Sequence, residues 1–495
     1  MKKYLLYVIF LSFFMFLFGA TVNAEERFDI TKTIEKAITE NLNIKLAEEK
    51  IKASEYALSV SRTNFLPTVS TGYQHKQDRK NLERTSTFTA SFAQPIFRGG
   101  SLVNQYRLAT FNLDAATINE QLIKRDIIFE AKNRYFSVLK AEKLKQVAEE
   151  SVKQLTSHKN VAENYYTVGL AALNDSLKAQ VELANAKLAF VTAENNFKIA
   201  EAAFKTFLRI PPDQEIILED IQSNKNGSFL EAEKIKQIAE AVVNELVSLK
   251  KMTEDYYNLG LASSKDIAKV QIDIENAKQA LIAAENNIQI VLKDYTFDHD
   301  FEYCKRQSEQ HRVEIKLADI DINIAKTSLK LEESKLYPSI DFKYSYSNTG
   351  NDTNLYDDEG LPPSIAENFN ASLTASWEMW NWGRYLLSRK EKAHNLEQAK
   401  INRERLLDEL YLEVKKAFLK TLEAEQNISV VEKAVEQAEE NFRIVNRSYE
   451  QQIVNTTDVV DANTLLTHTK TNYFNALYDF KIAKASLLKE MGLYE

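Results

Sequence analysis

The sequence predicts an α+β membrane protein in which long helices alternate with four short strands. Glycine and proline, which most often break helices, number only 11 and 7 among 495 residues, so long uninterrupted helices are expected. Four segments alternate apolar and polar side chains, which is typical of strands with one apolar face. The order of these elements occurs twice along the chain, which indicates an internal duplication.

The composition excludes several classes of protein. Hydrophobic residues make up 44% and charged residues 27% of the chain, which is too apolar for a disordered protein. The mean hydropathy of −0.37 excludes a bundle of membrane-spanning helices. A net charge of −8 argues against a nucleic-acid partner. The single cysteine, Cys304, excludes an internal disulfide and a cysteine-rich zinc site.

Residues 1–24 are predicted to be a secretory signal peptide. Lys2 and Lys3 precede the apolar run Tyr4–Phe18, and Val22-Asn23-Ala24 fits a cleavage site before Glu25. The alternative is a membrane anchor, but a spanning helix needs about 20 apolar residues and this run is shorter.

The remaining chain divides into two repeats and an insertion. Residues 25–220 and 311–495 each read helix, strand, loop, strand, long helix, turn and helix. Residues 221–310 are predicted to be an inserted helical hairpin with its connector, because 232–287 repeats 141–196 with 28 identities in 56 positions. This copy lacks strands, so we expect it to stay in the periplasm. It either adds a girdling or adaptor-like element or packs outside and changes little.

The alternating strands are expected at Val69–Tyr73, Phe88–Phe92, Ile340–Tyr346 and Ala371–Met379. Strands of about ten residues cross an outer membrane when tilted, although a soluble sheet is the alternative. Four strands leave two open edges, and each unpaired backbone group in lipid costs several kcal/mol. Copies of the chain should therefore pool their strands into a closed barrel, with 8 strands in a dimer or 12 in a trimer.

The long helices are expected from about Ser101 to Tyr166 and from about Arg384 to Tyr449. At 1.5 Å per residue each would extend roughly 95 Å, which is comparable with the depth of a periplasm. A short turn and a returning helix follow each of them, and we place the returning helices at Asp175–Phe207 and Asp458–Lys489.

Two segments, Gln94–Gly100 and Trp380–Gly383, look like a strand-to-helix signature. With the signal peptide and the two similar halves, they make the chain resemble the TolC family of outer-membrane channels. The resemblance implies a homotrimer with a 12-stranded barrel in outer-membrane lipid and a periplasmic α-helical coiled-coil tunnel. It also implies a passive exit duct in a tripartite efflux pump or a type I secretion system. The implied partners are a periplasmic adaptor protein and an inner-membrane transporter.

The first turn after a long helix contains Val168, Gly169 and Leu170. It resembles the periplasmic tip at which the family docks its adaptor. Glycine permits the left-handed backbone that reverses a chain, and the two flanking residues offer apolar contacts. The alternative is a plain helix-reversing turn.

The second turn leads into Asp458 and Asp461, which lie three residues apart and hence on one helix face. In a trimer they would form two rings of carboxylates at the pore mouth, which would favour cations and bind blocking multivalent cations. The alternative is that Asp458 caps the returning helix. Tyr449 and Asp175 match the tyrosine and aspartate that hold the family's mouth closed. Gln452 stands where a glycine is expected.

No catalytic constellation and no cofactor site is evident, so we expect no enzyme. A metal could gather between Asp298, His299 and Asp300 with Cys304 and His311, but a solvated connector is the favoured interpretation. The alternative function is a non-conducting periplasmic coiled-coil scaffold or adaptor. The sequence does not identify the cargo.

Overall fold

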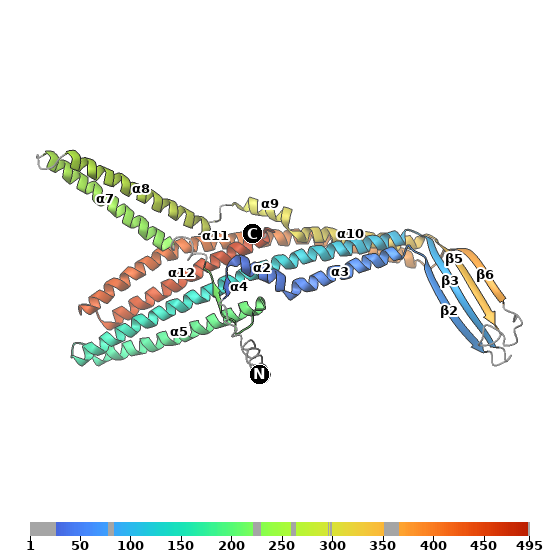
Figure 1. Cartoon of the computed structure of the whole chain (residues 1–495), viewed down its shortest axis with the longest axis horizontal. Helices are drawn as coiled ribbons and strands as arrows, with labels where there is room; N and C mark the ends of the chain where they lie inside the picture. The colour runs from blue at the N-terminus through green and yellow to red at the C-terminus, as the bar shows by residue number, and fades with distance from the viewer. Residues whose placement is uncertain are drawn as a thin grey trace, which may run out of the picture. The chain divides into compact units, whose positions relative to one another are not determined.

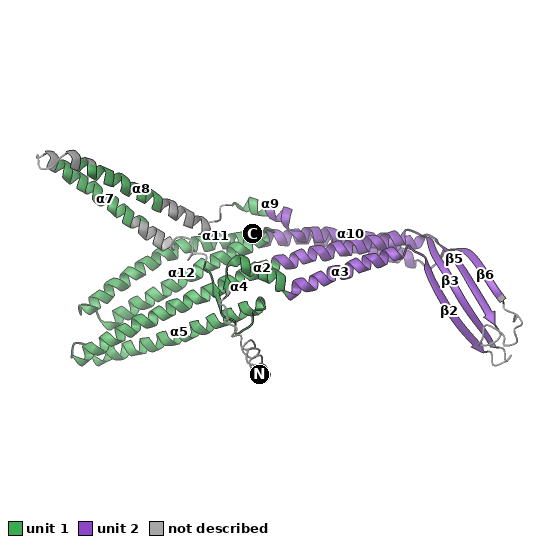
Figure 2. Cartoon of the chain, viewed as in Figure 1, with its two compact units in different colours: residues 1–41, 126–306, 414–495 green, residues 42–125, 307–413 purple. Residues whose placement is uncertain are grey.

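A computed structural model describes residues 26–77, 84–220, 229–258, 264–295, 297, 299–350 and 366–493. The predicted signal peptide lies outside these residues. The chain divides into two compact units (Figure 2). Unit 1 comprises residues 1–41, 126–306 and 414–495, and unit 2 comprises residues 42–125 and 307–413. Each unit therefore draws on both halves of the duplicated chain.

Unit 2 contains an antiparallel sheet with the strand order β2-β3-β5-β6 (Figure 1). The strands are β2 (Thr68–Gln77), β3 (Arg84–Arg98), β5 (Ser339–Gly350) and β6 (Ala366–Ser376). The central pair joins the two halves of the chain, with Ala90 opposite Tyr346. Within the described residues β2 and β6 each pair along one side only. The four predicted strands and their two open edges are thus confirmed.

The strand register gathers apolar side chains on one face of the sheet. Val69, Phe92, Tyr344 and Ala371 occupy adjacent positions on the four strands. The neighbouring row, Ser70, Ser91, Ser345 and Asn370, is polar and points to the opposite face. One apolar face and one polar face is the arrangement that the alternation predicted.

The last strand begins and ends earlier than the sequence pattern indicated. We expected it to reach Met379, but β6 ends at Ser376. The indole of Trp377 donates a hydrogen bond to the carbonyl oxygen of Leu336 at 3.1 Å, so the chain leaves the sheet there.

The helices of unit 2 are α3 (Leu42–Thr63), α10 (Val313–Glu333) with the 3-10 turn η1 (Ser334–Leu336), and the first parts of α4 and α11. Gly99, just before α4, has φ +59, and a Cβ there would collide with the backbone oxygen of Ser334. Only glycine permits this close approach between the end of β3 and the end of α10.

The long helices are α4 (Ser101–Thr167) and α11 (Arg384–Glu450), which confirms both expected segments within one residue. In unit 1 they reverse into α5 (Leu173–Phe207) and α12 (Thr456–Glu490). Each returning helix begins two residues before the expected aspartate.

A small parallel sheet lies in the core of unit 1. It pairs β1 (Glu26–Phe28) with β4 (Ile216–Leu218), and α2 (Ile30–Glu40) follows β1. The hydroxyl of buried Tyr135 donates to the backbone oxygen of Glu219 beside this sheet. Strand β1 is therefore tied to the segment that follows α5.

The predicted insertion contains two helices, α7 (Phe229–Asn258) and α8 (Ser264–Tyr295), which pack against each other. Helix α9 (Phe301–His311) follows them. Among the described residues, no helix is both long and apolar enough to cross a membrane.

Candidate functional site at the two helical turns

The first turn, residues 168–172, reverses the chain between α4 and α5. The amide of Gly169 donates to the oxygen of Tyr166 at 3.0 Å, and the amide of Leu170 donates to the oxygen of Tyr165 at 2.8 Å. These two bonds and a φ of +77 at Gly169 form a Schellman motif. The predicted role of glycine in reversing the chain follows from this geometry.

The first turn and the start of α5 carry an exposed apolar patch. Val168 is 66% exposed and Leu170 is 59% exposed, and Leu173 and Leu177 are each about half exposed. We call these four residues the first-turn patch. Grouped exposed apolar side chains are typical of a surface that contacts another molecule. The docking role of this turn stays a prediction.

The second turn, residues 451–455, has the same backbone geometry without glycine. The amide of Gln452 donates to the oxygen of Tyr449, and the amide of Ile453 donates to the oxygen of Ser448, both at 2.9 Å. Gln452 has φ +61, a left-handed conformation that costs a side chain about 1–2 kcal/mol. A glycine is therefore not required for this turn.

Helix α12 begins with a capping box. The side chain of Asn455 accepts hydrogen bonds from the amides of Thr457 and Asp458, and Asp458 accepts one from the amide of Asn455 at 2.9 Å. The cap residue is thus Asn455, and Asp458 completes the box at its third position. Asp461 is exposed one turn further along α12 and has no part in the cap.

Tyr449 lies in a buried contact between α4 and α11. Its side chain is 5% exposed, its hydroxyl is 3.2 Å from Oγ1 of Thr456, and its ring is 4.7 Å from that of His158. Burial raises the pKa of Tyr449, and the negative charge of Asp175 raises this pKa further. Asp175, in the first turn of α5, is therefore near Tyr449, although the hydroxyl bonds to Thr456 within this chain. The clasp between Tyr449 and Asp175 stays a prediction.

His158 is buried beside Tyr449 without a hydrogen-bond partner. It is 4% exposed, and among the described residues neither ring nitrogen has a partner. Burial lowers the pKa of His158 to about 4, because an imidazolium ion is costly to desolvate. The ring is therefore neutral at pH 7.

Direct hydrogen bonds join the helix ends beside the two turns, and they were not predicted from the sequence. The hydroxyl of Tyr165 donates to the backbone oxygen of Glu450 at 3.0 Å, and the amine of Lys178 donates to the hydroxyl of Thr457 at 3.2 Å. The only signal in the sequence is the Tyr165-Tyr166 pair, which recurs as Tyr256-Tyr257 in the insertion.

The alternative metal site does not form among the described residues. Within that part of the chain, no three His, Cys, Asp or Glu side chains come together, and Asp298 lies outside it. Cys304 is buried, and burial raises the pKa of its thiol to about 11. His299 stacks on Tyr303 with 4.1 Å between the ring centroids. Cys304 is thus packed in a core, whereas His299, Asp300 and His311 are exposed, as expected of a solvated connector.

Comparisons with known proteins agree with this architecture. The family model described as "Outer membrane efflux protein" matches residues 33–208 and 306–493 and passes over the insertion. The outer membrane protein VceC from Vibrio cholerae is 13% identical, with a TM-score of 0.69 covering 94% of this chain and 97% of that one. The CmeC outer membrane channel of Campylobacter jejuni is 12% identical, with a TM-score of 0.68 covering 94% of this chain and 85% of that one.

A curated relative is the "Toxin and drug export protein A" of Aggregatibacter actinomycetemcomitans. It is 23% identical over 194 residues, which is 38% of this chain and 42% of the relative. The matched segment therefore spans less than half of that protein.

Proposed function

The chain belongs to the outer membrane efflux protein family, and from this premise we propose that three copies form a passive exit duct through the outer membrane. The duct would be the outermost component of a tripartite efflux pump or a type I secretion system. A periplasmic adaptor and an inner-membrane transporter would supply the cargo and the energy. We assign the chain no catalytic role.

The observation that carries this proposal is the sheet with two open edges and one apolar face. A sheet that ends in unpaired edges is not stable in lipid, because no water satisfies its backbone groups. Pairing β2 of one copy with β6 of the next removes both edges. Three copies would give the 12-stranded barrel of the proposed duct.

A cross-linking experiment tests this closure. Ser70→Cys on β2 and Asn370→Cys on β6 place thiols on the polar face, while the native Cys304 is buried. With a flexible bis-maleimide, we expect the double variant in outer membranes to run as a covalent trimer on denaturing gels. Each single variant is the control and should stay monomeric. A double variant that also stays monomeric would exclude the proposed strand pairing.

The first-turn patch is proposed to dock the adaptor. Leu170→Asp puts a charge into this patch, and we expect it to weaken binding of the purified cognate adaptor at least tenfold. Ile453→Asp is the matched control, because Ile453 holds the equivalent position in the second turn and is 70% exposed. Equal losses in the two variants would argue against a specific role for the first turn.

The second turn is proposed to form the gate, with Asp458 and Asp461 as pore rings and Tyr449 and Asp175 as the clasp. Tyr449→Phe should raise single-channel conductance in planar bilayers. Thr456→Val is the control. It removes the Thr456 hydroxyl, which bonds to the hydroxyl of Tyr449, and it leaves Asp175 in place. If both variants conduct alike, the clasp is rejected.

The carboxylate rings are tested separately by channel block. Asp461→Asn should weaken block by a trivalent cation at least tenfold, and it leaves the capping box intact. Persistent block in Asp461→Asn, and also in Asp458→Ala with Asp461→Ala, would exclude the rings.

The insertion, 221–310, is proposed to be a girdling hairpin that needs a partner surface. Val147, Ser151 and His158 of α4 are buried in unit 1. Their counterparts in the sequence repeat, Ile238, Val242 and Leu249 of α7, are more apolar and yet exposed. This exposed stripe favours a packing role over a passive duplication.

A further inference from the structure

A hollow of about 730 Å³ lies where the strands of unit 2 meet its helices. Gly99 and Tyr337, which line it, adjoin the end of β3 and the start of β5 in the sequence. In an outer-membrane protein whose sheet spans the bilayer, this junction lies at the membrane–water boundary on the helical side. The proposed roles of the two turns make no use of this hollow.

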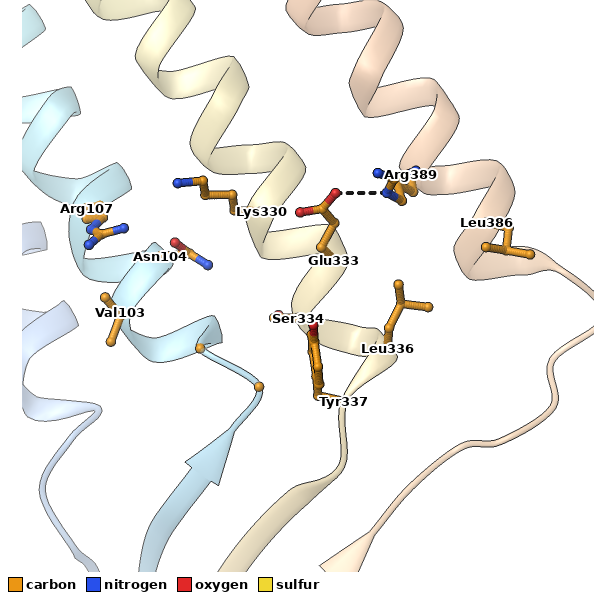
Figure 3. Close-up of a pocket in the computed structure, with 12 residues that line it drawn as sticks. Val103, Asn104, Arg107, Lys330, Glu333, Ser334, Leu336, Tyr337, Leu386 and Arg389 are labelled. Atoms are coloured by element: carbon orange, nitrogen blue, oxygen red, sulfur yellow. Dashed lines mark hydrogen bonds and ion pairs between the residues drawn. The ribbon is translucent and has the colours of Figure 1, made fainter.

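Positive charge predominates on the wall of the hollow. Arg107, Lys330 and Arg389 line it together with one carboxylate, Glu333. Arg389 bonds to Glu333 at 2.8 Å, whereas neither Arg107 nor Lys330 has an ion-pair partner among the residues described. Figure 3 shows Arg107 from α4 and Lys330 from α10 pointing toward each other across the hollow. Two uncompensated cations remain on the wall.

Asn104 supplies an unused polar group at the same place. It is only 9% exposed and lines the hollow, and its side chain has no hydrogen-bond partner in the described part of the chain. Figure 3 shows it on α4, directed toward α10. This amide can therefore donate a hydrogen bond to a ligand in the hollow.

The start of α4 adds a third source of positive potential. Gly99 and Gly100 both line the hollow, both have positive φ, and α4 begins at the next residue. The first amides of a helix have no partner within it, and they carry the positive end of its dipole. Cations, a free amide and a helix N-terminus together form an anion-binding arrangement.

The remaining wall is apolar and accessible. Val103, Leu336, Tyr337 and Leu386 line the hollow and are each more than one third exposed. A ligand that fits both the cationic and the apolar parts of the wall must be an anion with hydrocarbon next to its charged group. We propose that the hollow binds the headgroup phosphate of a glycerophospholipid, with Arg107, Lys330 and Asn104 on the phosphate and the apolar residues along the glycerol and acyl chains.

Native mass spectrometry of the full-length protein in a neutral detergent tests this site. The probes are dioleoylphosphatidylglycerol, dioleoylglycerol, which lacks the phosphate, and inorganic phosphate. We expect the phosphatidylglycerol to be retained and the dioleoylglycerol to be lost. Inorganic phosphate at the same concentration should not displace the bound lipid.

Two variants remove the proposed phosphate-binding groups, and one control variant keeps them. Arg107→Gln with Lys330→Gln, and separately the near-isosteric Asn104→Asp, should each weaken phosphatidylglycerol binding at least tenfold. Lys316→Gln with Lys326→Gln removes two charges from α10 outside the hollow and should bind as the wild type does. All variants should keep the oligomeric state of the wild type on size exclusion.

Three outcomes would overturn the proposal. Unchanged binding in both recognition variants would exclude this location. Equal retention of dioleoylglycerol would show that acyl chains alone bind. Displacement by inorganic phosphate would assign the hollow to a free anion. None of these outcomes depends on conductance, so the proposed duct is tested separately.

Discussion

The first and second turns reverse the chain with the same two backbone hydrogen bonds, but they differ in the residue at the left-handed position and in the residue that precedes the returning helix. Gly169 holds the left-handed position of the first turn, and Gln452 holds it in the second. Helix α5 begins after Ala172 without a side-chain cap, whereas α12 begins after Asn455 with a capping box. The turn with the favourable backbone residue thus lacks the cap, and the turn with the strained residue has it.

The difference between the two turns indicates that the fold requires the chain to reverse at each point, but does not require a particular residue there. Each turn has one favourable and one unfavourable local feature, of about 1 kcal/mol each. What distinguishes the turns is their surface. The first exposes the apolar patch, and the second places Asp461 in solvent and holds Tyr449 against His158.

The largest expected effect is a loss of folding stability at acid pH. It originates at His158 of α4, whose ring packs against Tyr449 beside the second turn. The unfolded chain binds a proton near the ordinary pKa of 6.5, but the buried ring has a pKa of about 4. Stability is therefore full above about pH 6.5 and falls by about 3 kcal/mol per chain as the pH drops to 4. Thermal unfolding of the detergent-solubilised protein measures this loss.

The control for this pH dependence is His158→Leu, since the insertion has Leu249 at the equivalent position. Its unfolding temperature should fall less steeply between pH 6.5 and 4 than that of the wild type. Parallel curves for the two proteins would mean that other groups cause the acid sensitivity.

A smaller effect is expected from exchanging the helix caps. Asn455→Ala removes two accepted hydrogen bonds and should destabilise the start of α12 by about 1 kcal/mol. Hydrogen exchange of the nearby amides would then quicken about fivefold. Ala172→Asn should slow exchange at the start of α5 by a similar factor. A cap that changed neither rate would show that packing alone sets these helix ends.

The smallest effect concerns the left-handed position. Gln452→Gly relieves backbone strain but loosens the unfolded chain, so the net gain is about 0.5 kcal/mol. Gly169→Gln should cost about the same at the first turn. Local hydrogen exchange at the ends of α11 and α4 measures both changes. If both variants stabilised, or both destabilised, their helix ends, the left-handed position would not account for the difference between the turns.

Periodicity and breaker residues were sufficient to predict the long helices and the open sheet. The scarcity of glycine and proline predicted that α4 and α11 are long. Helix α4 ends two residues before Gly169, whereas α11 ends at Glu450 with no glycine or proline nearby, so its end was predicted from the repeat of the first half. The starts of the returning helices were placed two residues late. The capping alternative for Asp458 is correct only in part, because the cap residue is Asn455 and Asp458 completes the capping box.

The contacts around Tyr449 could not be predicted from the sequence. His158 and Tyr165 meet the Tyr449 ring only because α4 and α11 lie side by side in unit 1. Spacing along one helix carries no information about its neighbour. For the same reason the hollow beside Asn104 could not be predicted, because its wall combines residues of three helices and only Gly99 and Gly100 belong to a segment that the sequence analysis singled out.

The central strand pair sets the order of events during biogenesis. Strand β3 pairs with β5. Helices α4 and α5 and the insertion lie between these two strands in the sequence. If the chain is exported from its N-terminus, we expect the first β-hairpin to reach the periplasm before β5 does. Its apolar face would then be uncovered, and such strands tend to pair with wrong partners. We expect maturation to depend strongly on periplasmic chaperones and to slow when residues are added to the insertion.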